Sequence, residues 1–114
     1  MDWSSKRCVP CEGGTPRLSA AQAAEGAHFL TGWAVGAGGT RLTKHYEFRD
    51  FAGAMRFVNA MAEVAEAEGH HPDFLVHGYK QVDVTLWTHA VGGLSENDLI
   101  LAAKLDAREE SRGT

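Results

Sequence analysis

The stretch from Asp50 to Pro72 constrains the fold of this chain more than any other part of the sequence. Apolar side chains recur in it at three- and four-residue spacing, which predicts an amphipathic helix over residues 51–68. Asp50 suits the N-cap, and Gly69 suits the position just past the helix end. Pro72 favours an extended conformation at His71 and stops the helix from resuming. The predicted apolar stripe is Phe51, Ala54, Met55, Val58, Met61, Ala62 and Ala65.

Shorter elements precede this helix. Residues 20–30 form a helix-compatible run, and Ser19 in front of them is a suitable N-cap. Residues 33–35 are predicted as a short strand, and the glycine-rich stretch after them favours a turn. Residues 40–48 then alternate apolar and polar side chains, which is the period of a half-buried strand. We therefore predict a hairpin between the first two helices.

The strongest strand pattern lies at residues 81–87, where apolar and polar side chains alternate. Ser95 and Asp98 stand at capping-box spacing, with Asp in place of the usual Glu, and open a last helix. The order helix, hairpin, helix, strand region, helix predicts an antiparallel sheet with helices on one face. The predicted fold class is therefore α+β.

Length and charge limit the classes of partner. The chain has 114 residues, enough for one domain with a thin core, and a second copy would bury more surface. The net charge is −4 and no run of Lys or Arg forms a stripe, which argues against binding to nucleic acid or anionic membrane. No apolar run has the length of a membrane span, and residues 1–10 lack the core of a signal peptide. We expect a cytoplasmic homo-oligomer.

The first seventeen residues, rich in Gly, Pro and Ser, predict a flexible arm that carries both cysteines. Cys8 and Cys11 have C-x-x-C spacing, which occurs in zinc sites and in thioredoxin-type redox motifs. One pair supplies only half of a structural zinc site, and no predicted strand precedes the pair as it does in the redox motif. We favour two thiols on an arm over metal or redox chemistry.

Three histidines are the strongest candidates for chemistry. His70 and His71 lie where the long helix ends, and His89 follows the strand at 81–87. The unperturbed pKa of histidine lies near neutrality, so a cluster of histidines can donate and accept protons together. The alternative is three unrelated surface histidines at the ends of elements. Spacing alone does not decide between the two interpretations.

A metal site is the competing functional interpretation. Adjacent residues of an extended chain point to opposite sides, so His70 and His71 are poorly placed to bind one ion together. Nothing in the sequence brings the cysteines to these histidines, and we expect no metal there. We assign no site to the remaining histidines, which are His28, His45 and His77.

Three motifs surround the candidate histidines. They are Glu66-x-x-x-His70-His71-Pro72, Val82-x-Val84-x-Leu86-x-Thr88-His89 and Gly93-Leu94-Ser95-Glu96-x-Asp98-x-x-x-Ala102. Together they resemble the pterin-4a-carbinolamine dehydratase family, and the resemblance runs from about Leu18 to Asp106. The cysteine-containing arm is also similar to one found in some bacterial members.

The resemblance implies a four-stranded antiparallel sheet with three helices packed on one face, in the order α-β-β-α-β-β-α. It implies a domain at residues 18–108, between an arm at 1–17 and a tail at 109–114. It implies a lyase that dehydrates 4a-hydroxy-tetrahydropterin to quinonoid dihydropterin and water, without a metal or other cofactor. The family's usual client is an aromatic amino-acid hydroxylase, which releases this carbinolamine, and members assemble as dimers or tetramers.

The resemblance also implies residue roles. By motif position, His70 and His89 match an acid–base pair, and His71 matches a histidine that helps to hold the pterin. Glu66 matches a carboxylate beside the site. The residues that we expect to bind the substrate are Glu66, Gly69, Pro72, Trp87, Thr88 and Asp98.

The alternative within the same family is a non-catalytic protein-binding or assembly module. Some animal members double as dimerisation cofactors of a homeodomain transcription factor, and some bacterial relatives help to assemble RuBisCO. Those assembly proteins lose the histidine motif, which is intact in this chain. The resemblance therefore favours the enzyme.

Overall fold

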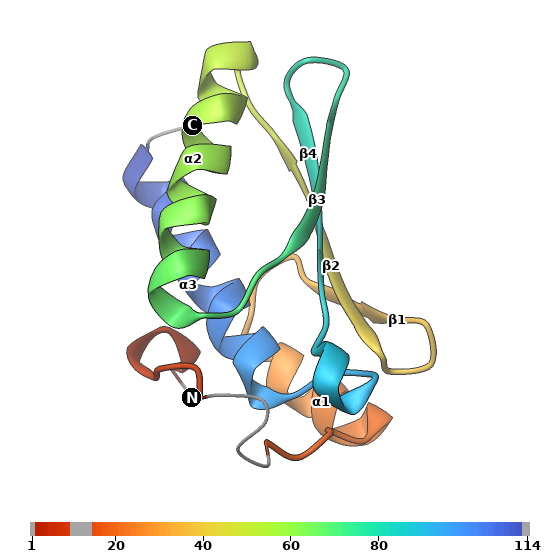
Figure 1. Ribbon diagram of the computed structural model, residues 1–114. Coiled ribbons are helices and arrows are strands. Elements are labelled where there is room, and N and C mark those ends of the chain that lie inside the picture. The colour runs from red at the N-terminus through yellow and green to blue at the C-terminus, as the bar shows by residue number, and fades with distance from the viewer. Residues whose placement is uncertain (1, 10–14, 113–114) are drawn as a thin grey trace.

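The computed structural model describes residues 2–9 and 15–112. Its strands are β1 (Ala34–Gly36), β2 (Arg41–Glu47), β3 (Asp73–His77) and β4 (Gln81–Leu86). Its helices are α1 (Ala20–Ala27), α2 (Phe51–Glu68) and α3 (Glu96–Arg112), with 3₁₀ turns η1 (Trp3–Ser5) and η3 (His89–Val91). The strands form one antiparallel sheet in the order β1-β2-β4-β3, with α2 and α3 side by side against it (Figure 1). The predicted fold class and element order are confirmed.

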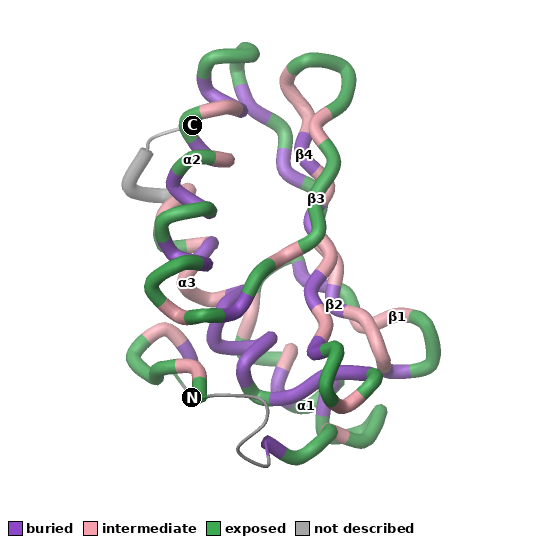
Figure 2. Tube along the Cα trace, viewed as in Figure 1, coloured by how far each residue is buried: buried purple, intermediate pink, exposed green. Residues whose placement is uncertain are grey.

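The alternation of side chains in β4 sets the two faces of the sheet. Val82, Val84 and Leu86 are buried toward the helices, whereas Asp83 and Thr85 lie on the opposite face. The buried parts of the chain gather where the sheet and the helices meet (Figure 2). In the described part of the chain, none of the helices has both the length and the apolar character needed to cross a membrane.

Strand β3 is the element that side-chain alternation does not predict. It lies at the edge of the sheet and, among the described strands, pairs only with β4. Phe74 is 49% exposed and Leu75 is 60% exposed, although they lie on opposite faces of the strand. Because neither face is well buried, the sequence shows no clear apolar and polar alternation here.

Helix α2 has the predicted ends. The Asp50 carboxylate accepts a hydrogen bond of 2.8 Å from the Gly53 N–H. Gly69 has a φ of 67°, the left-handed conformation that glycine adopts without strain, and its N–H donates to the Ala65 carbonyl. The chain therefore leaves the helix in a fixed direction just before His70.

The predicted apolar stripe of α2 is partly wrong. Phe51 and Ala62 are exposed, whereas Phe57 and Val64, which the prediction omitted, are buried. The Phe57 ring lies 4.5 Å from the Tyr46 ring, centroid to centroid, and fills the space between helix and sheet. Apolar residues occur on more than one side of this helix, and packing on the sheet selects which side is buried.

Helix α1 begins as predicted but ends earlier. Ser19 and Gln22 form a reciprocal capping box, which fixes the start of the helix. The helix ends at Ala27 instead of continuing to Leu30, and the chain turns through i→i+3 bonds that include Phe29 N–H to Gly26 O.

Residues 2–9, expected as part of a flexible arm, lie against all three helices. The buried Trp3 donates from its indole Nε1 to the Gly26 carbonyl at 3.1 Å. The Val9 backbone and the Asn97 side chain exchange two hydrogen bonds of 2.9 and 2.8 Å. Residues 2–9 are therefore packed on the domain, with a buried indole and hydrogen-bonded backbone groups. The composition of this segment had predicted a flexible arm instead. Cys11 lies outside the described residues.

We expect a chain that begins at Thr15 to unfold at a lower temperature but to keep most of its turnover. The truncation removes the buried Trp3 and the Val9–Asn97 bonds, but it also removes the entropic cost of ordering this segment. The net loss of stability should be roughly 1–2 kcal/mol, or several degrees in Tm. Thermal unfolding and kcat should both be measured. A truncated chain that folds normally but loses turnover would show that the segment takes part in catalysis.

Cys8 is held in a position that suppresses its reactivity. Its N–H donates to the Glu68 carboxylate at 2.8 Å, and its thiol donates to the Asn97 carbonyl. Burial, with a further contribution from the nearby carboxylates, raises the pKa of the Cys8 thiol to about 12. Because the thiolate is the reactive form, little of it exists at neutral pH.

In a Cys11→Ser variant, we therefore expect Cys8 to react with a disulfide reagent about 10²-fold or more slowly in the folded chain than in urea. Absorbance of the released thiol measures both rates. Equal rates in the folded and unfolded chains would contradict the burial of this thiol.

Candidate active site

A pocket of about 290 Å³ brings the three predicted histidines together. His70 and His71 come from the chain between α2 and β3, and His89 begins η3 just past β4. Because β3 and β4 are antiparallel neighbours, the start of β3 lies beside the end of β4. The residues that line the pocket are Gly69, His70, His71, Pro72, Asp73, Trp87, His89 and Ala90.

His70 is buried and held by a carboxylate. Its Nε2 lies 2.7 Å from Oδ1 of Asp98, which is itself fully buried. An ionised carboxylate can only accept hydrogen bonds, so His70 Nε2 carries the proton in this contact. In the neutral imidazole, Nδ1 then has the free lone pair and can accept a proton.

Asp98 also fixes the chain that leads to His89. Its Oδ2 accepts from the Thr88 hydroxyl at 2.8 Å and from the Ser95 N–H at 3.0 Å. The Ser95 hydroxyl lies 2.9 Å from the Thr88 hydroxyl and accepts from the Asn97 N–H at 3.2 Å. One buried carboxylate therefore holds a histidine that follows α2 and the residue that precedes His89.

This network explains why two predicted substrate-binding residues do not line the pocket. Thr88 and Asp98 are both fully buried, and their polar atoms are occupied by each other and by neighbouring groups. The capping-box spacing of Ser95 and Asp98 identified the start of α3 correctly. It gave no sign that the same carboxylate also reaches His70.

His71 differs from His70 in its surroundings. Its side chain is 63% exposed, and its Nε2 lies 2.6 Å from Oε2 of Glu66, one turn back on α2. Glu66 is also exposed, and it contacts the site through His71 rather than through the pocket wall. Of these two consecutive histidines, one imidazole is therefore buried and the other faces solvent.

His89 packs on an aromatic ring. The His89 and Trp87 rings lie 3.6 Å apart, centroid to centroid, and the Arg41 guanidinium lies 3.8 Å from the Trp87 centroid. The Trp87 indole donates to the Asp73 carboxylate at 3.0 Å. Sequence reasoning missed Arg41 and Asp73. The alternation of the strands was the available signal, because it places both on the same outer face of the sheet.

The Nε2 atoms of His70 and His71 each contact a different carboxylate, that of Asp98 and that of Glu66. These contacts do not resemble the convergence of several imidazoles on one ion. A separate group of metal-type ligands, His45, His77 and Asp83, lies on the outer face of the sheet.

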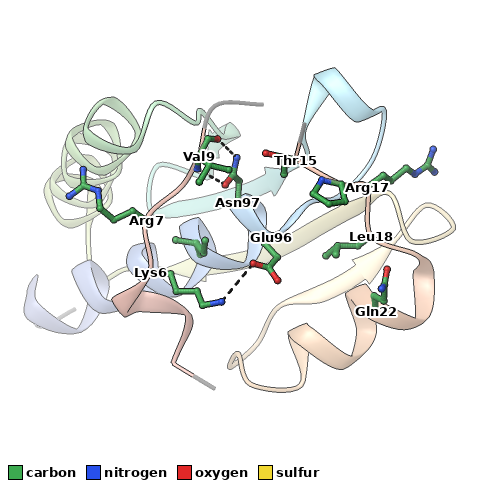
Figure 3. Close-up of a pocket in the computed structure, with 11 residues that line it drawn as sticks. Lys6, Arg7, Val9, Thr15, Arg17, Leu18, Gln22, Glu96 and Asn97 are labelled. Carbon is green, nitrogen blue, oxygen red and sulfur yellow. Dashed lines mark hydrogen bonds and ion pairs between the residues drawn. The ribbon is translucent and has the colours of Figure 1, made fainter. Parts of the chain in front are cut away.

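A larger cavity of about 910 Å³ lies elsewhere, between the N-terminal residues and the start of α3 (Figure 3). The Val9–Asn97 hydrogen bonds and the Lys6–Glu96 ion pair lie on its walls. Its wall includes residues on both sides of the segment 10–14, and the described residues that line it include no histidine. We therefore place the candidate site at the smaller pocket, where the acid–base groups are.

Residues 16–108 of the chain match the family model described as pterin 4 alpha carbinolamine dehydratase. A protein of Dechloromonas aromatica (strain RCB), provisionally named as such a dehydratase, is 52% identical over 103 residues, which are 90% of this chain and 89% of that protein. Pterin-4-alpha-carbinolamine dehydratase 2, mitochondrial, of Arabidopsis thaliana is 40% identical over 108 residues, or 92% of this chain and 58% of that protein.

Two solved structures are similar in fold. A transcriptional coactivator/pterin dehydratase from Brucella melitensis has a TM-score of 0.77 and 35% identity, covering 82% of this chain and 99% of that one. A pterin dehydratase-like protein identified as a RuBisCO assembly factor in the alpha-carboxysome has a TM-score of 0.60 and 27% identity, covering 70% of this chain and 92% of that one.

Proposed function

Because the chain belongs to the pterin-4a-carbinolamine dehydratase family, we propose that it dehydrates a 4a-hydroxy-tetrahydropterin to a quinonoid dihydropterin and water. In this reaction the bond between C4a and the hydroxyl oxygen breaks, and N5 loses its proton. A double bond forms between N5 and C4a, and the hydroxyl leaves with a proton as water. The reaction therefore needs one group that accepts a proton and one that donates a proton.

His70 and His89 are the proposed acid–base pair. The Nε2–H of His70 is held by Asp98, which leaves Nδ1 to exchange a proton. His89, at the start of η3, lines the same pocket. Each positioned acid or base typically contributes about 10²- to 10⁴-fold to a rate. The observation that carries this proposal is the convergence of the three motif histidines on one pocket.

The other pocket residues would hold the pterin. We assign His71 to orientation of the substrate, and Glu66 to holding the His71 imidazole in place. Gly69, Pro72 and Trp87 form the wall of the pocket. Thr88 and Asp98 are buried, so we assign them to positioning of the two catalytic histidines instead of to substrate contact.

The physiological role that we propose is recycling of the pterin of an aromatic amino-acid hydroxylase by a cytoplasmic homo-oligomer. The alternative is a non-catalytic binding module, and the observation behind it is the likeness to the RuBisCO assembly factor. The intact pair of His70 and His89 supports the enzyme. Turnover of the proposed substrate separates the two, because a binding module has no need to accelerate this reaction.

We expect the turnover to be independent of metal. His70 and His71 direct nitrogens at carboxylates, and both proposed proton transfers use imidazole groups alone. Synthetic 4a-hydroxy-tetrahydropterin should be dehydrated faster than its spontaneous rate by chain dialysed against EDTA, and added zinc should not increase kcat. Loss of turnover after EDTA, with recovery on adding zinc, would require a metal in the reaction.

A further inference from the structure

Two histidines and one aspartate meet on the outer face of the sheet, away from the helices. His45 of β2 lies directly opposite Asp83 of β4. On the other side of Asp83, β3 places Leu75 opposite it, and His77 is two residues further along on the same face. Three adjacent strands therefore present these side chains to one patch of solvent.

The donor atoms of the three side chains are close. His45 Nδ1 lies 2.5 Å from Asp83 Oδ1, and His77 Nε2 lies 2.7 Å from Asp83 Oδ2. One ligand atom from each residue can be chosen so that all lie within 4.8 Å of one another. The side chains are 41–48% exposed, so an ion can reach them from solvent.

We propose that His45, His77 and Asp83 form a binding site for a divalent zinc ion. Two imidazole nitrogens and one carboxylate oxygen are donors that zinc prefers, and three protein ligands leave a fourth position for water. Zinc–ligand bonds of about 2.0–2.1 Å at tetrahedral angles place donor atoms about 3.3 Å apart. To reach that spacing, the two nitrogen–oxygen contacts, which are now 2.5 and 2.7 Å, would lengthen by rotation of these exposed side chains.

The charge of the group also suits a cation. The Asp83 carboxylate brings negative charge to the group, and the two imidazoles that contact it bind zinc through neutral ring nitrogens. Zinc would replace the two hydrogen bonds with direct bonds to the nitrogens and to the oxygen, and the proton on each of these nitrogens would move to the other ring nitrogen or to water.

This site is separate from the histidine pocket. Asp83 and the pocket residue Trp87 are four residues apart along the chain, which is roughly 13 Å in an extended strand. His77 ends β3 near the β3–β4 turn, whereas η3 lies at the other end of β4 (Figure 1). Zinc at the outer face therefore does not reach the atoms that react in the pocket.

Titration of the untagged full chain with zinc chloride in a calorimeter tests the proposal. We expect about one zinc ion per chain, and we expect His45→Gln and Asp83→Asn each to weaken binding by about tenfold or more. His28→Gln replaces an exposed histidine outside the group and is the matched control, so its affinity should equal that of the wild type. Cys11→Ser should also bind zinc normally.

Three results would overturn the proposal. They are no binding by the wild type up to millimolar zinc, unchanged affinity in both His45→Gln and Asp83→Asn, or loss of binding in Cys11→Ser. Should a variant fail to fold, imidazole NMR signals of the wild type decide instead. Zinc should shift the signals of His45 and His77, and a shift confined to other histidines would contradict the site. None of these measurements depends on dehydratase turnover.

Discussion

Replacing His70 or His89 by alanine is expected to lower kcat for 4a-hydroxy-tetrahydropterin by about 10²- to 10⁴-fold each. Each change removes one of the two proposed proton-transfer groups from the pocket. Binding of the pterin should change less, because the remaining wall of the pocket is intact. Steady-state kinetics on the two single variants measure both quantities.

His71→Ala is the informative comparison for these variants. Its imidazole is solvent-facing and bonded to Glu66, so we expect its loss to raise KM more than it lowers kcat. His28→Ala, at the end of α1, should leave both constants unchanged. Equal and small losses in all three pocket variants, with folding intact, would mean that the cluster is not the catalytic site.

Asp98→Ala is expected to cause a large loss of stability. The Asp98 carboxylate is fully buried and accepts hydrogen bonds from His70, Thr88 and the Ser95 N–H. Removing it leaves three buried donors without this acceptor, and breaking such a buried charged network typically costs about 3–5 kcal/mol. Urea unfolding should show this loss, whereas Glu25→Ala, an exposed carboxylate on α1, should change stability by less than about 0.5 kcal/mol.

Asp98→Asn separates the positioning of His70 from its effect on folding. The amide keeps the size of the side chain but offers one acceptor oxygen in place of two, so at least one buried donor loses its partner. We expect kcat to fall while KM stays near that of the wild type, and the imidazole N–H signal of His70 to move in NMR spectra. An unchanged kcat, together with an unchanged His70 signal, would contradict the positioning role of Asp98.

The parts of the fold that were predictable are those with local signals. Asp50 and Gly69 mark the ends of α2, and alternation marks β2 and β4. Strand β3 has no such signal, because it is an edge strand with exposed residues on both faces. The burial of Phe57 in place of Phe51 depends on how the helix packs on the sheet, and no local pattern specifies that packing.

The candidate site likewise combines features that the sequence predicts with contacts that only the packing of the fold creates. The convergence of His70, His71 and His89 follows from the motif and from the antiparallel pairing of β3 with β4. The contact of Asp98 with His70 joins residues 28 positions apart, and no spacing pattern in the sequence predicts it. The burial of Trp3 was missed because the composition of its segment favours an arm, while the segment lies against α1 and α3, which are distant in sequence.

The contacts of Trp87 with Arg41 and Asp73, and the patch of His45, His77 and Asp83, depend on the register of the sheet. Alternation places their residues on the outer face, but only the strand order brings them into contact. For this reason His45 and His77 gave no sign of a shared site when the sequence was considered alone.

The rate at which the chain dehydrates synthetic 4a-hydroxy-tetrahydropterin measures the proposed chemistry most directly. It should be compared with the spontaneous rate and with the double variant His70→Ala/His89→Ala. We predict that the wild type accelerates the reaction and that the double variant loses most of this acceleration. The combined loss should be smaller than the product of the two single losses, because the histidines act as one unit. A folded wild-type chain that dehydrates the pterin no faster than buffer would contradict the enzyme and favour the non-catalytic module.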